Sequence, residues 1–405
     1  MGKTVLLIGA FDVKGEEYHF VRQLILEKGY EVFTMNFGVL GSTDLFRTDI
    51  ENAEVAQAGG AGIDQLQREG DRGHAMKIMS QGVAVLAKKY YAEGRFSGVL
   101  GMGGSGGTTV ITSAMRALPI GLPKVMVSTV AASDISIYVG IKDITMIPSI
   151  VDVAGINMIS EKIFKEAAGA ICGMLSMDYR STAAQKPIIA ASMFGNTTAC
   201  VDRCRHTLTG KGYEVLVFHA TGTGGRTMEG LVEDGYVSAV LDITTTEWAD
   251  ELCGGVFTAG ERRLDAPGKM GIPHLIVPGC VDMVNFGPRS TVPERYEGRL
   301  FYVWNPSVTL MRTNVTENTQ IGEVFARKAN EAKGKVAFLL PLKGLSILDS
   351  PGNEFWWPEA DQAIYDAIKK NVKPGIPVVE MDCNINDEAF ADKAVDMLLQ
   401  LQNQK

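Results

Sequence analysis

The sequence predicts an α/β protein with mostly parallel sheets and helices on both faces of each sheet. Three observations carry this prediction: short apolar runs alternate with helical patterns, helix-like segments end in glycine before the next run, and the pattern occurs twice along the chain. Alternation of this kind is typical of βαβ units, whose parallel sheets are covered on both faces. A chain of 405 residues is also too long for one ordinary core, which favours two domains.

An internal repeat divides the chain into two halves. The segment from Lys3 to Phe11 has its counterpart 183 positions further on (186 − 3), and the motif Lys-Gly-Tyr-Glu-Val recurs at the same offset at 28–32 and 211–215. Two later matches lie at offsets of 141 (238 − 97) and 150 (271 − 121), so the halves differ by insertions. Such motifs are also common where a helix gives way to a strand, but their shared order favours duplication.

We therefore predict two duplicated Rossmann-like domains, 1–180 and 183–405. Strands are expected near Val5, Val32, Val99, Val125 and Thr145 in the first half, and near Ile188, Val215, Val240, Leu275, Phe301, Val336 and Val378 in the second. We also expect a long helix from about Ser149 to Met174, one polar loop holding Asn305, Arg312 and Glu317, and a final amphipathic helix over 387–402.

Composition and charge argue against several classes of protein. The net charge of −8 disfavours nucleic acid as the main partner, because nucleic-acid binding needs a basic face. No apolar stretch is long enough to span a membrane, and the short apolar N-terminus runs into a polar loop as a first strand does. The six cysteines are scattered, and the one close pair, Cys200 and Cys204, lacks the second pair that a zinc site requires. We expect a cytoplasmic protein.

A glycine-rich loop at 101–109 is the strongest candidate for a ligand site. Five glycines in the seven residues 101–107 follow a predicted strand and open a helix, so backbone N–H groups can approach an anion closely. Residues 101–106 fit G-x-G-x-x-G, but no acidic residue follows at the distance that a dinucleotide fold requires, and Thr108 stands where a P-loop has lysine. A turn that only permits close helix packing is the alternative. We assign nucleotide binding to Gly103, Gly104, Ser105, Gly106, Gly107, Thr108 and Thr109.

Other strand-end loops of the first half add charged and hydroxyl groups. Asp12, Lys14 and Glu16 lie between the first strand and its helix, a combination that suits phosphate together with Mg²⁺. We expect Asp12 and Lys14 to contact the nucleotide and Asp12 and Glu16 to bind the metal. Ser128 and Thr129 end a later strand and join the nucleotide site.

The second half carries its own glycine-rich loop at 221–227, after a different strand. Arg226 is suited to bidentate binding of phosphate or carboxylate, and His219 to acid or base chemistry near neutral pH. Together with Asp242, at another strand end, these two residues are the predicted catalytic group. A strand-end histidine is as often a hydrogen-bonded structural residue, and that alternative stays open.

Several ordered motifs carry a family resemblance that spans essentially the whole chain. They are 9–16 (Gly-Ala-Phe-Asp-Val-Lys-Gly-Glu), 101–109, 128–132 (Ser-Thr-Val-Ala-Ala), 219–226 and 277–282 (Val-Pro-Gly-Cys-Val-Asp). The chain resembles a family of uncharacterised microbial proteins and is similar to the ATP-binding N-terminal region of the tomato mosaic virus resistance protein. The resemblance implies two Rossmann-like subdomains with ATP between them and self-association as a homodimer or larger oligomer. It also allows a separately encoded partner with a barrel fold.

These observations predict an ATP- and Mg²⁺-dependent enzyme of the transferase or ligase type. Its substrate is expected to be a small hydroxy-acid or sugar-acid-like metabolite, held in a cleft between the two domains. The alternative is a regulatory module that binds a nucleotide without turnover. An NAD-type dehydrogenase is the third possibility, disfavoured by the missing ribose-binding acid.

Overall fold

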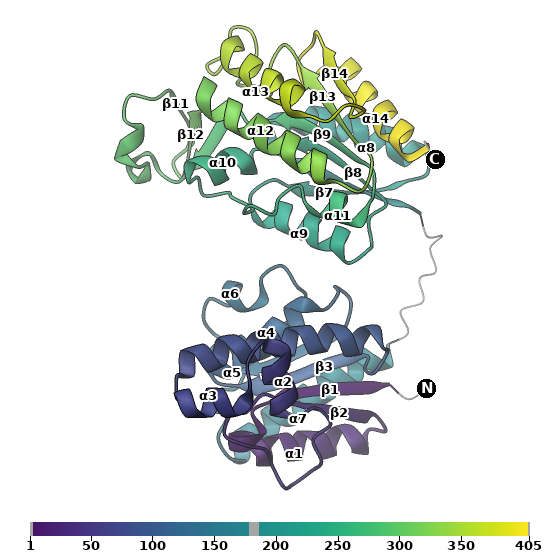
Figure 1. Ribbon diagram of the computed structural model, residues 1–405, viewed down its shortest axis with the longest axis vertical. Coiled ribbons are helices and arrows are strands. Elements are labelled where there is room, and N and C mark those ends of the chain that lie inside the picture. Colours follow the sequence, from purple (N-terminus) through teal and green to yellow (C-terminus); the bar gives the residue numbers. More distant parts are fainter. Residues whose placement is uncertain (1–2, 178–185, 404–405) are drawn as a thin grey trace. The chain divides into compact units, whose positions relative to one another are not determined.

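The computed structural model describes residues 3–177 and 186–403 (Figure 1). The chain divides into two compact units, Met1–Ser181 and Thr182–Lys405. Each unit has a predominantly parallel sheet with helices on both faces, as the sequence predicts. In the described parts of the chain, no helix combines the length and apolar character needed to cross a membrane.

The first unit is built on a five-stranded parallel sheet with the order β2-β1-β3-β4-β5. Its strands are β1 (Thr4–Gly9), β2 (Glu31–Asn36), β3 (Gly98–Gly103), β4 (Lys124–Ser128) and β5 (Thr145–Pro148). The order reverses direction between β1 and β3. At such a reversal the connections leave the sheet toward opposite sides, which opens a crevice at the carboxyl ends of the strands.

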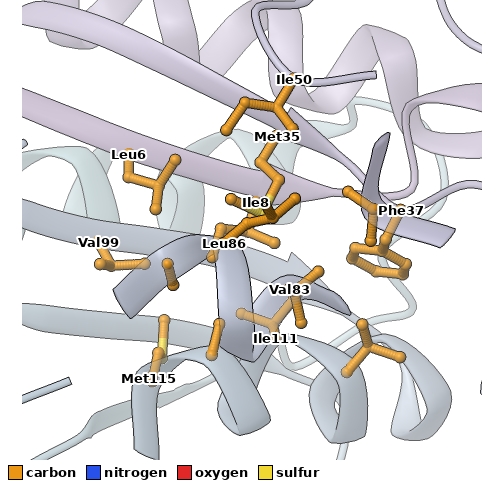
Figure 2. Close-up of a cluster of buried hydrophobic side chains, with 14 of the residues drawn as sticks. Leu6, Ile8, Met35, Phe37, Ile50, Val83, Leu86, Val99, Ile111 and Met115 are labelled. Carbon is orange, nitrogen blue, oxygen red and sulfur yellow. The ribbon is translucent and has the colours of Figure 1, made fainter. Parts of the chain in front are cut away.

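Alternation along β1 gives this sheet two apolar faces. Leu6 and Ile8 pack against helices on one side (Figure 2), whereas Val5 and Leu7 pack against helices on the other. The first side is covered by α2 (Asn52–Gly59), α4 (Arg72–Ala92) and α5 (Ser105–Ala117), and the second by α1 (Phe11–Glu27) and α7 (Met158–Ser176). The short helices α3 (Ile63–Glu69) and α6 (Ser136–Val139) lie in connections.

The second unit contains a six-stranded parallel sheet with the order β14-β13-β9-β8-β6-β7. The strands are β6 (Ile188–Met193), β7 (Glu214–His219), β8 (Ala239–Thr244), β9 (His274–Gly279), β13 (Val336–Pro341) and β14 (Val378–Met381). One face is covered by α8 (Thr198–Gly210) and α14 (Glu388–Asn403), and the other by α9 (Thr223–Glu233), α10 (Glu247–Cys253), α12 (Val315–Glu331) and α13 (Pro358–Asn371). The short α11 (Ala266–Met270) precedes β9.

The predicted repeat is confirmed by strand position and strand order. β2 and β7 lie 183 positions apart (214 − 31), and β3 and β8 lie 141 apart (239 − 98). Val5 and Ile188 fall in β1 and β6, and each of these strands pairs with the next strand of its half on one side and the third on the other. The two halves thus share the core of one topology.

Three sequence expectations need correction. The helix expected from Ser149 begins at Met158, because β5 occupies the residues just before Ser149 and Asn157 caps the helix, accepting from Ile159 N–H and Ser160 N–H. The strand near Phe301 is β11 (Phe301–Asn305), which joins β10 (Met283–Phe286) and β12 (Val308–Arg312) in a separate antiparallel sheet. Arg312 and Glu317 therefore lie in β12 and α12, and not in one loop with Asn305.

The hydroxyl of Tyr18 joins β1 and β3 near their carboxyl ends. It lies 2.6 Å from the carbonyl oxygen of Ile8 and 2.8 Å from that of Met102, and it accepts a hydrogen bond from Met102 N–H at 2.6 Å. Tyr18 is fully buried, and burial raises the pKa of its hydroxyl far above the ordinary value. A Cβ atom on Gly9 would lie 2.3 Å from the ring, so the chain needs glycine there.

We predict that Tyr18→Phe lowers the free energy of unfolding by about 1–3 kcal/mol, because it leaves the buried Met102 N–H without an acceptor. Urea unfolding followed by circular dichroism measures the change. Tyr91→Phe, which removes a hydroxyl from a half-exposed ring, is the matched control. Equal stability of the two variants would show that the strand-end hydrogen bonds contribute nothing net.

Candidate functional site

A cavity of about 590 Å³ opens at the carboxyl ends of β1, β2 and β3 in the first unit. Four segments supply most of its wall: 10–14 after β1, 37–40 after β2, 66–79 from α3 and α4, and 102–110 at the glycine-rich loop. The cavity lies beside the reversal in strand order, where open α/β sheets bind their ligands. Its place in the fold agrees with the site that the glycine loop predicts.

The glycine-rich loop presents the start of α5 to the cavity. Gly104 is the residue before the helix, and no side chain accepts a hydrogen bond from the first helical N–H groups. Gly103, Gly104, Ser105, Gly106 and Gly107 all line the cavity. An uncapped helix start directs unpaired N–H groups and the positive end of the helix dipole at whatever lies there, which favours an anion.

The hydroxyl residues assigned to this site hold the loop in shape. Thr108 and Ser128 are buried with their hydroxyl oxygens 2.6 Å apart, and the Thr108 hydroxyl donates to the Gly104 carbonyl at 2.8 Å. The Thr109 hydroxyl donates to the Ser105 carbonyl at 3.0 Å, and Thr129 N–H donates to the Gly103 carbonyl at 3.3 Å. These four residues are outside the cavity wall and support it from behind.

Asp12 and Lys14 lie on the wall, and Glu16 does not. The Asp12 carboxylate accepts from Leu40 N–H at 2.9 Å through Oδ2, while its buried Oδ1 has no hydrogen-bond partner among the described residues. A Cβ on Gly38 would lie 2.2 Å from that Oδ1, so glycine is needed for the loop after β2 to pass the carboxylate. Lys14 donates through Nζ to the Val153 carbonyl. The wall thus offers one free acceptor, at Asp12.

Sequence reasoning missed Arg72 and the apolar part of the wall. Arg72, the first residue of α4, makes no hydrogen bond or ion pair with the described residues, and a Cβ on Gly106 would lie 3.4 Å from its Nη2. Apolar side chains from the connection between β2 and β3 complete the wall, among them Phe37, Leu66, Met76 and Met79. The available signal was the fall in repeat offset from 183 to 141, which means 42 extra residues (183 − 141) in this connection of the first half.

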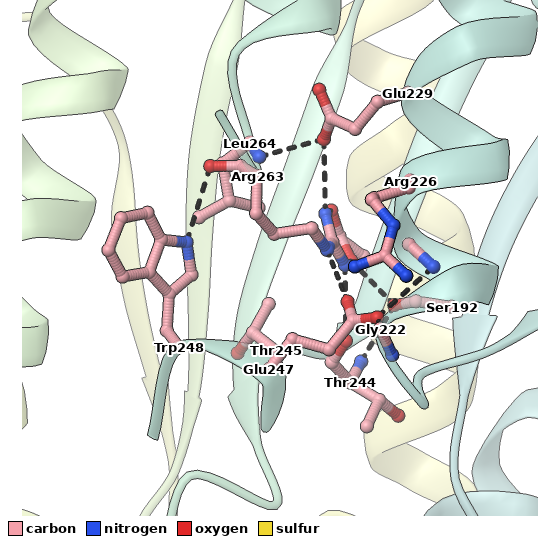
Figure 3. A network of polar contacts seen from close by, with 12 residues as sticks. Ser192, Gly222, Arg226, Glu229, Thr244, Thr245, Glu247, Trp248, Arg263 and Leu264 are labelled. Atoms are coloured by element: carbon pink, nitrogen blue, oxygen red, sulfur yellow. Dashed lines mark hydrogen bonds and ion pairs between the residues drawn. The ribbon is translucent and has the colours of Figure 1, made fainter. Parts of the chain in front are cut away.

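In the second unit the glycine loop binds a carboxyl group of the chain itself (Figure 3). Glu247 Oε1 accepts from Gly222 N–H at 2.8 Å and from Gly225 N–H at 3.1 Å, at the start of α9. Its other oxygen accepts from Arg263 Nε at 2.6 Å, and Glu247 is buried. A Cβ on Gly225 would lie 2.2 Å from this carboxyl group, so Glu247 fills the space in front of the loop.

Asp242 belongs to the same buried network. Its carboxylate accepts from Arg263 Nη1 at 2.7 Å, from Ser192 Oγ at 2.5 Å and interacts with His274 Nε2 at 3.1 Å. Burial opposes ionisation, but the charge and hydrogen bonds of Arg263, with His274, hold the pKa of Asp242 well below its usual range. Glu229 also contacts Arg263, at 3.3 Å. Asp242 is therefore surrounded by protein on all of its hydrogen-bonding sides.

His219 and Arg226 are more exposed than Asp242 and have other partners. The His219 ring packs against Phe194, with ring centroids 5.3 Å apart. Arg226 donates to the Thr258 carbonyl at 2.8 Å and to the Thr223 hydroxyl at 3.3 Å. No hydrogen bond or ion pair of the described residues joins His219, Arg226 and Asp242 to one another.

One further carboxyl group of this region has a displaced pKa. Asp250, on α10 after Glu247, is fully buried and accepts from Asn285 N–H at 2.8 Å and Asn285 Nδ2 at 2.7 Å. Burial raises the pKa of Asp250 to about 8, against the opposing effect of these hydrogen bonds. Because the folded state keeps the proton at pH values where the unfolded chain has lost it, Asp250 stabilises the fold most at low pH.

We predict that this contribution is complete below about pH 4 and is lost as the pH rises toward 8, by at most about 1.4 kcal/mol per pH unit. Asp250→Asn, which cannot ionise, should flatten the dependence of unfolding free energy on pH between 5 and 8. Urea unfolding at several pH values measures it, with Asp396→Asn on the exposed side of α14 as the charge-matched control. If Asp250→Asn keeps the slope of the parent protein, a different group titrates.

Known proteins match the chain along its length. Residues 3–180 match the N-terminal domain and residues 186–402 the C-terminal domain of the Uncharacterised protein family (UPF0261). A UPF0261 protein of Clostridium tetani is 48% identical over 392 residues, covering 96% of this chain and 97% of that protein. The ToMV resistance protein Tm-1 of Solanum lycopersicum is 41% identical over 337 residues, which cover 82% of this chain and 45% of the tomato protein.

Among solved structures, UDP-N-acetylglucosamine 2-epimerase from Rickettsia bellii covers 99% of this chain and 96% of its own, at 9% identity and a TM-score of 0.25. A likeness at that level carries no argument about function. The sequence matches, in contrast, confirm the resemblance drawn from the motifs, both to microbial proteins and to the tomato protein. The chain belongs to the UPF0261 family.

Proposed function

We propose that the first unit binds a nucleotide, ATP foremost, in the cavity at the carboxyl ends of β1, β2 and β3. The observation that carries the proposal is the combination of an uncapped helix start with an apolar wall in one cavity. The start of α5 suits a phosphate, and the apolar wall suits a flat base. The family resemblance stated above favours ATP among nucleotides.

The donor set on the wall is compatible with Mg²⁺. The described residues contain no group of three or more histidine, cysteine, aspartate or glutamate side chains placed to hold a metal ion. Mg²⁺ bound with a nucleotide needs fewer, because one or two carboxylates and the phosphates supply its ligands together with water. Asp12, with a free Oδ1, and Asp152 are the carboxylates on the wall, and we assign Asp12 to this role. Glu16 would act only from outside the wall.

We further propose an ATP-dependent enzyme of the transferase or ligase type that acts on a small hydroxy acid or sugar acid. His219 and Arg226 are the candidates for substrate contact in the second unit, since both are exposed enough to meet a ligand. Asp242 would act by holding Arg263 and His274 in place, because its own oxygens are already in contact with protein groups. A nucleotide-responsive module without turnover is the second candidate, favoured by the enclosed state of Asp242.

We predict that Gly104→Val abolishes Mg-ATP binding and leaves the fold intact. The backbone at Gly104 suits any residue, and a Cβ there would have only the Thr129 hydroxyl within 4 Å, at 3.8 Å, so the side chain is tolerated but blocks approach to the helix start. Isothermal titration calorimetry measures the affinity. The control is Gly62→Val, at a helix start with extended backbone and open space around the new Cβ. Undiminished affinity in Gly104→Val would remove this loop from the site.

Turnover separates the enzyme from the module. We expect the protein to release ADP or AMP from Mg-ATP when a panel of hydroxy acids and sugar acids is added, and Gly104→Val to release neither. Product release is followed by chromatography of the nucleotides. Saturable ATP binding with no consumption under any of these conditions would favour the regulatory module.

A further inference from the structure

The two halves of the chain have equivalent positions at the helix that follows their third strand. β3 and β8 lie 141 positions apart, and the next helices begin at Ser105 and Glu247. The same offset places Gly106 opposite Glu247 (247 − 106). A glycine therefore stands in the first half where the second half has a buried carboxyl side chain.

In the second half this position is a filled anion site. The Glu247 carboxyl group receives two backbone N–H groups from the glycine loop and the Nε of a fully buried arginine, Arg263. A carboxyl group held by main-chain donors and a guanidinium is bound as a phosphate or carboxylate ligand would be. Here the ligand is part of the chain.

In the first half the same position opens onto the cavity. Gly106 has no side chain, and the atoms nearest to a Cβ built there are the Met76 Cε at 3.3 Å, the Met76 Sδ at 3.4 Å and the Arg72 Nη2 at 3.4 Å. Arg72 has no acceptor among the described residues, unlike Arg263, which contacts three carboxyl groups. A guanidinium and an uncapped helix start thus face the position from which the side chain is missing.

We propose that Gly106 and Glu247 are the open and the closed form of one anion site, and that a phosphate of the bound ligand lies between Gly106 and Arg72. The inference rests on the proposed nucleotide site and adds the position of the charged group and the residue that selects for it. Arg72 binds the phosphate, and the base lies toward Leu66 and Met79, at the apolar end of the wall.

The first experiment removes the guanidinium. Arg72→Gln is expected to weaken binding of ATP and AMP about 10-fold to 100-fold, the usual effect of losing charge-assisted hydrogen bonds to a phosphate, and to leave adenosine binding unchanged. Lys77→Gln, which removes an exposed positive charge from the same helix outside the cavity wall, should leave all three affinities unchanged. Calorimetry at fixed salt gives the affinities.

The second experiment converts the open site to the closed form. Gly106→Glu is expected to abolish ATP and pyrophosphate binding while adenosine still binds, because the new carboxylate takes the place of the phosphate beside Arg72. Gly106→Gln adds nearly the same volume without charge and should reduce binding less. Thermal unfolding and circular dichroism of each variant verify the fold.

The outcomes distinguish this inference from the proposed function. If the parent protein binds ATP and Arg72→Gln binds it equally well, the inference is wrong and the nucleotide site stands. If the parent protein binds no nucleotide, the proposed function is wrong, and pyrophosphate alone then tests the anion site. Absence of pyrophosphate binding to the parent protein would overturn the inference as well.

Discussion

The architecture of the first unit depends on the hydrogen bonds that hold β1 and β3 together at the reversal of strand order. The connections that follow these strands lie on opposite faces of the sheet, so the main chain separates there. The Tyr18 hydroxyl bonds to the main chain of both strands at this point. Because a buried tyrosine hydroxyl needs partners, the strand ends are fixed relative to each other, and the glycine loop starts from a defined place. A cavity that depends on backbone N–H groups requires this rigidity, since those groups cannot be re-aimed by side-chain rotation.

The fold could be predicted well from the sequence, and the reasons are local. Each parallel strand is a short apolar run flanked by turn residues, and the final helix shows its buried face through Phe390, Ala394, Met397 and Leu398. The antiparallel sheet escaped prediction because β10 and β12 follow polar turns, and a strand such as β12 that ends in a buried arginine looks like part of a loop. Arg312 is buried only because Asp349 and Asp361, far along the chain, accept its hydrogen bonds. Long-range pairing of this kind leaves no periodic signal.

The candidate site could be predicted in part. Glycine loops mark themselves in a sequence, but whether a loop is open depends on what lies in front of it. The loop at 221–227 looks like a ligand site until Glu247 is seen to occupy it, and nothing near Glu247 in the sequence announces this. Arg72 was missed for the opposite reason, because an arginine at the start of a helix is ordinary unless its neighbourhood is known. Asp242 looked like a strand-end acid available for chemistry, and its enclosure by Arg263 and His274 comes from two separate later segments.

The 42 extra residues between β2 and β3 divide the labour within the first unit (183 − 141). The strands and the glycine loop belong to the common topology of both halves, whereas Leu66, Arg72, Met76 and Met79 lie in the longer connection. Relatives of this chain are therefore free to exchange that connection for another and so acquire a different ligand, while the sheet and the phosphate-facing backbone stay the same. Ligand preference would then follow one contiguous stretch of sequence, and a chimaera that moves residues 37–79 between two family members would carry the preference with it.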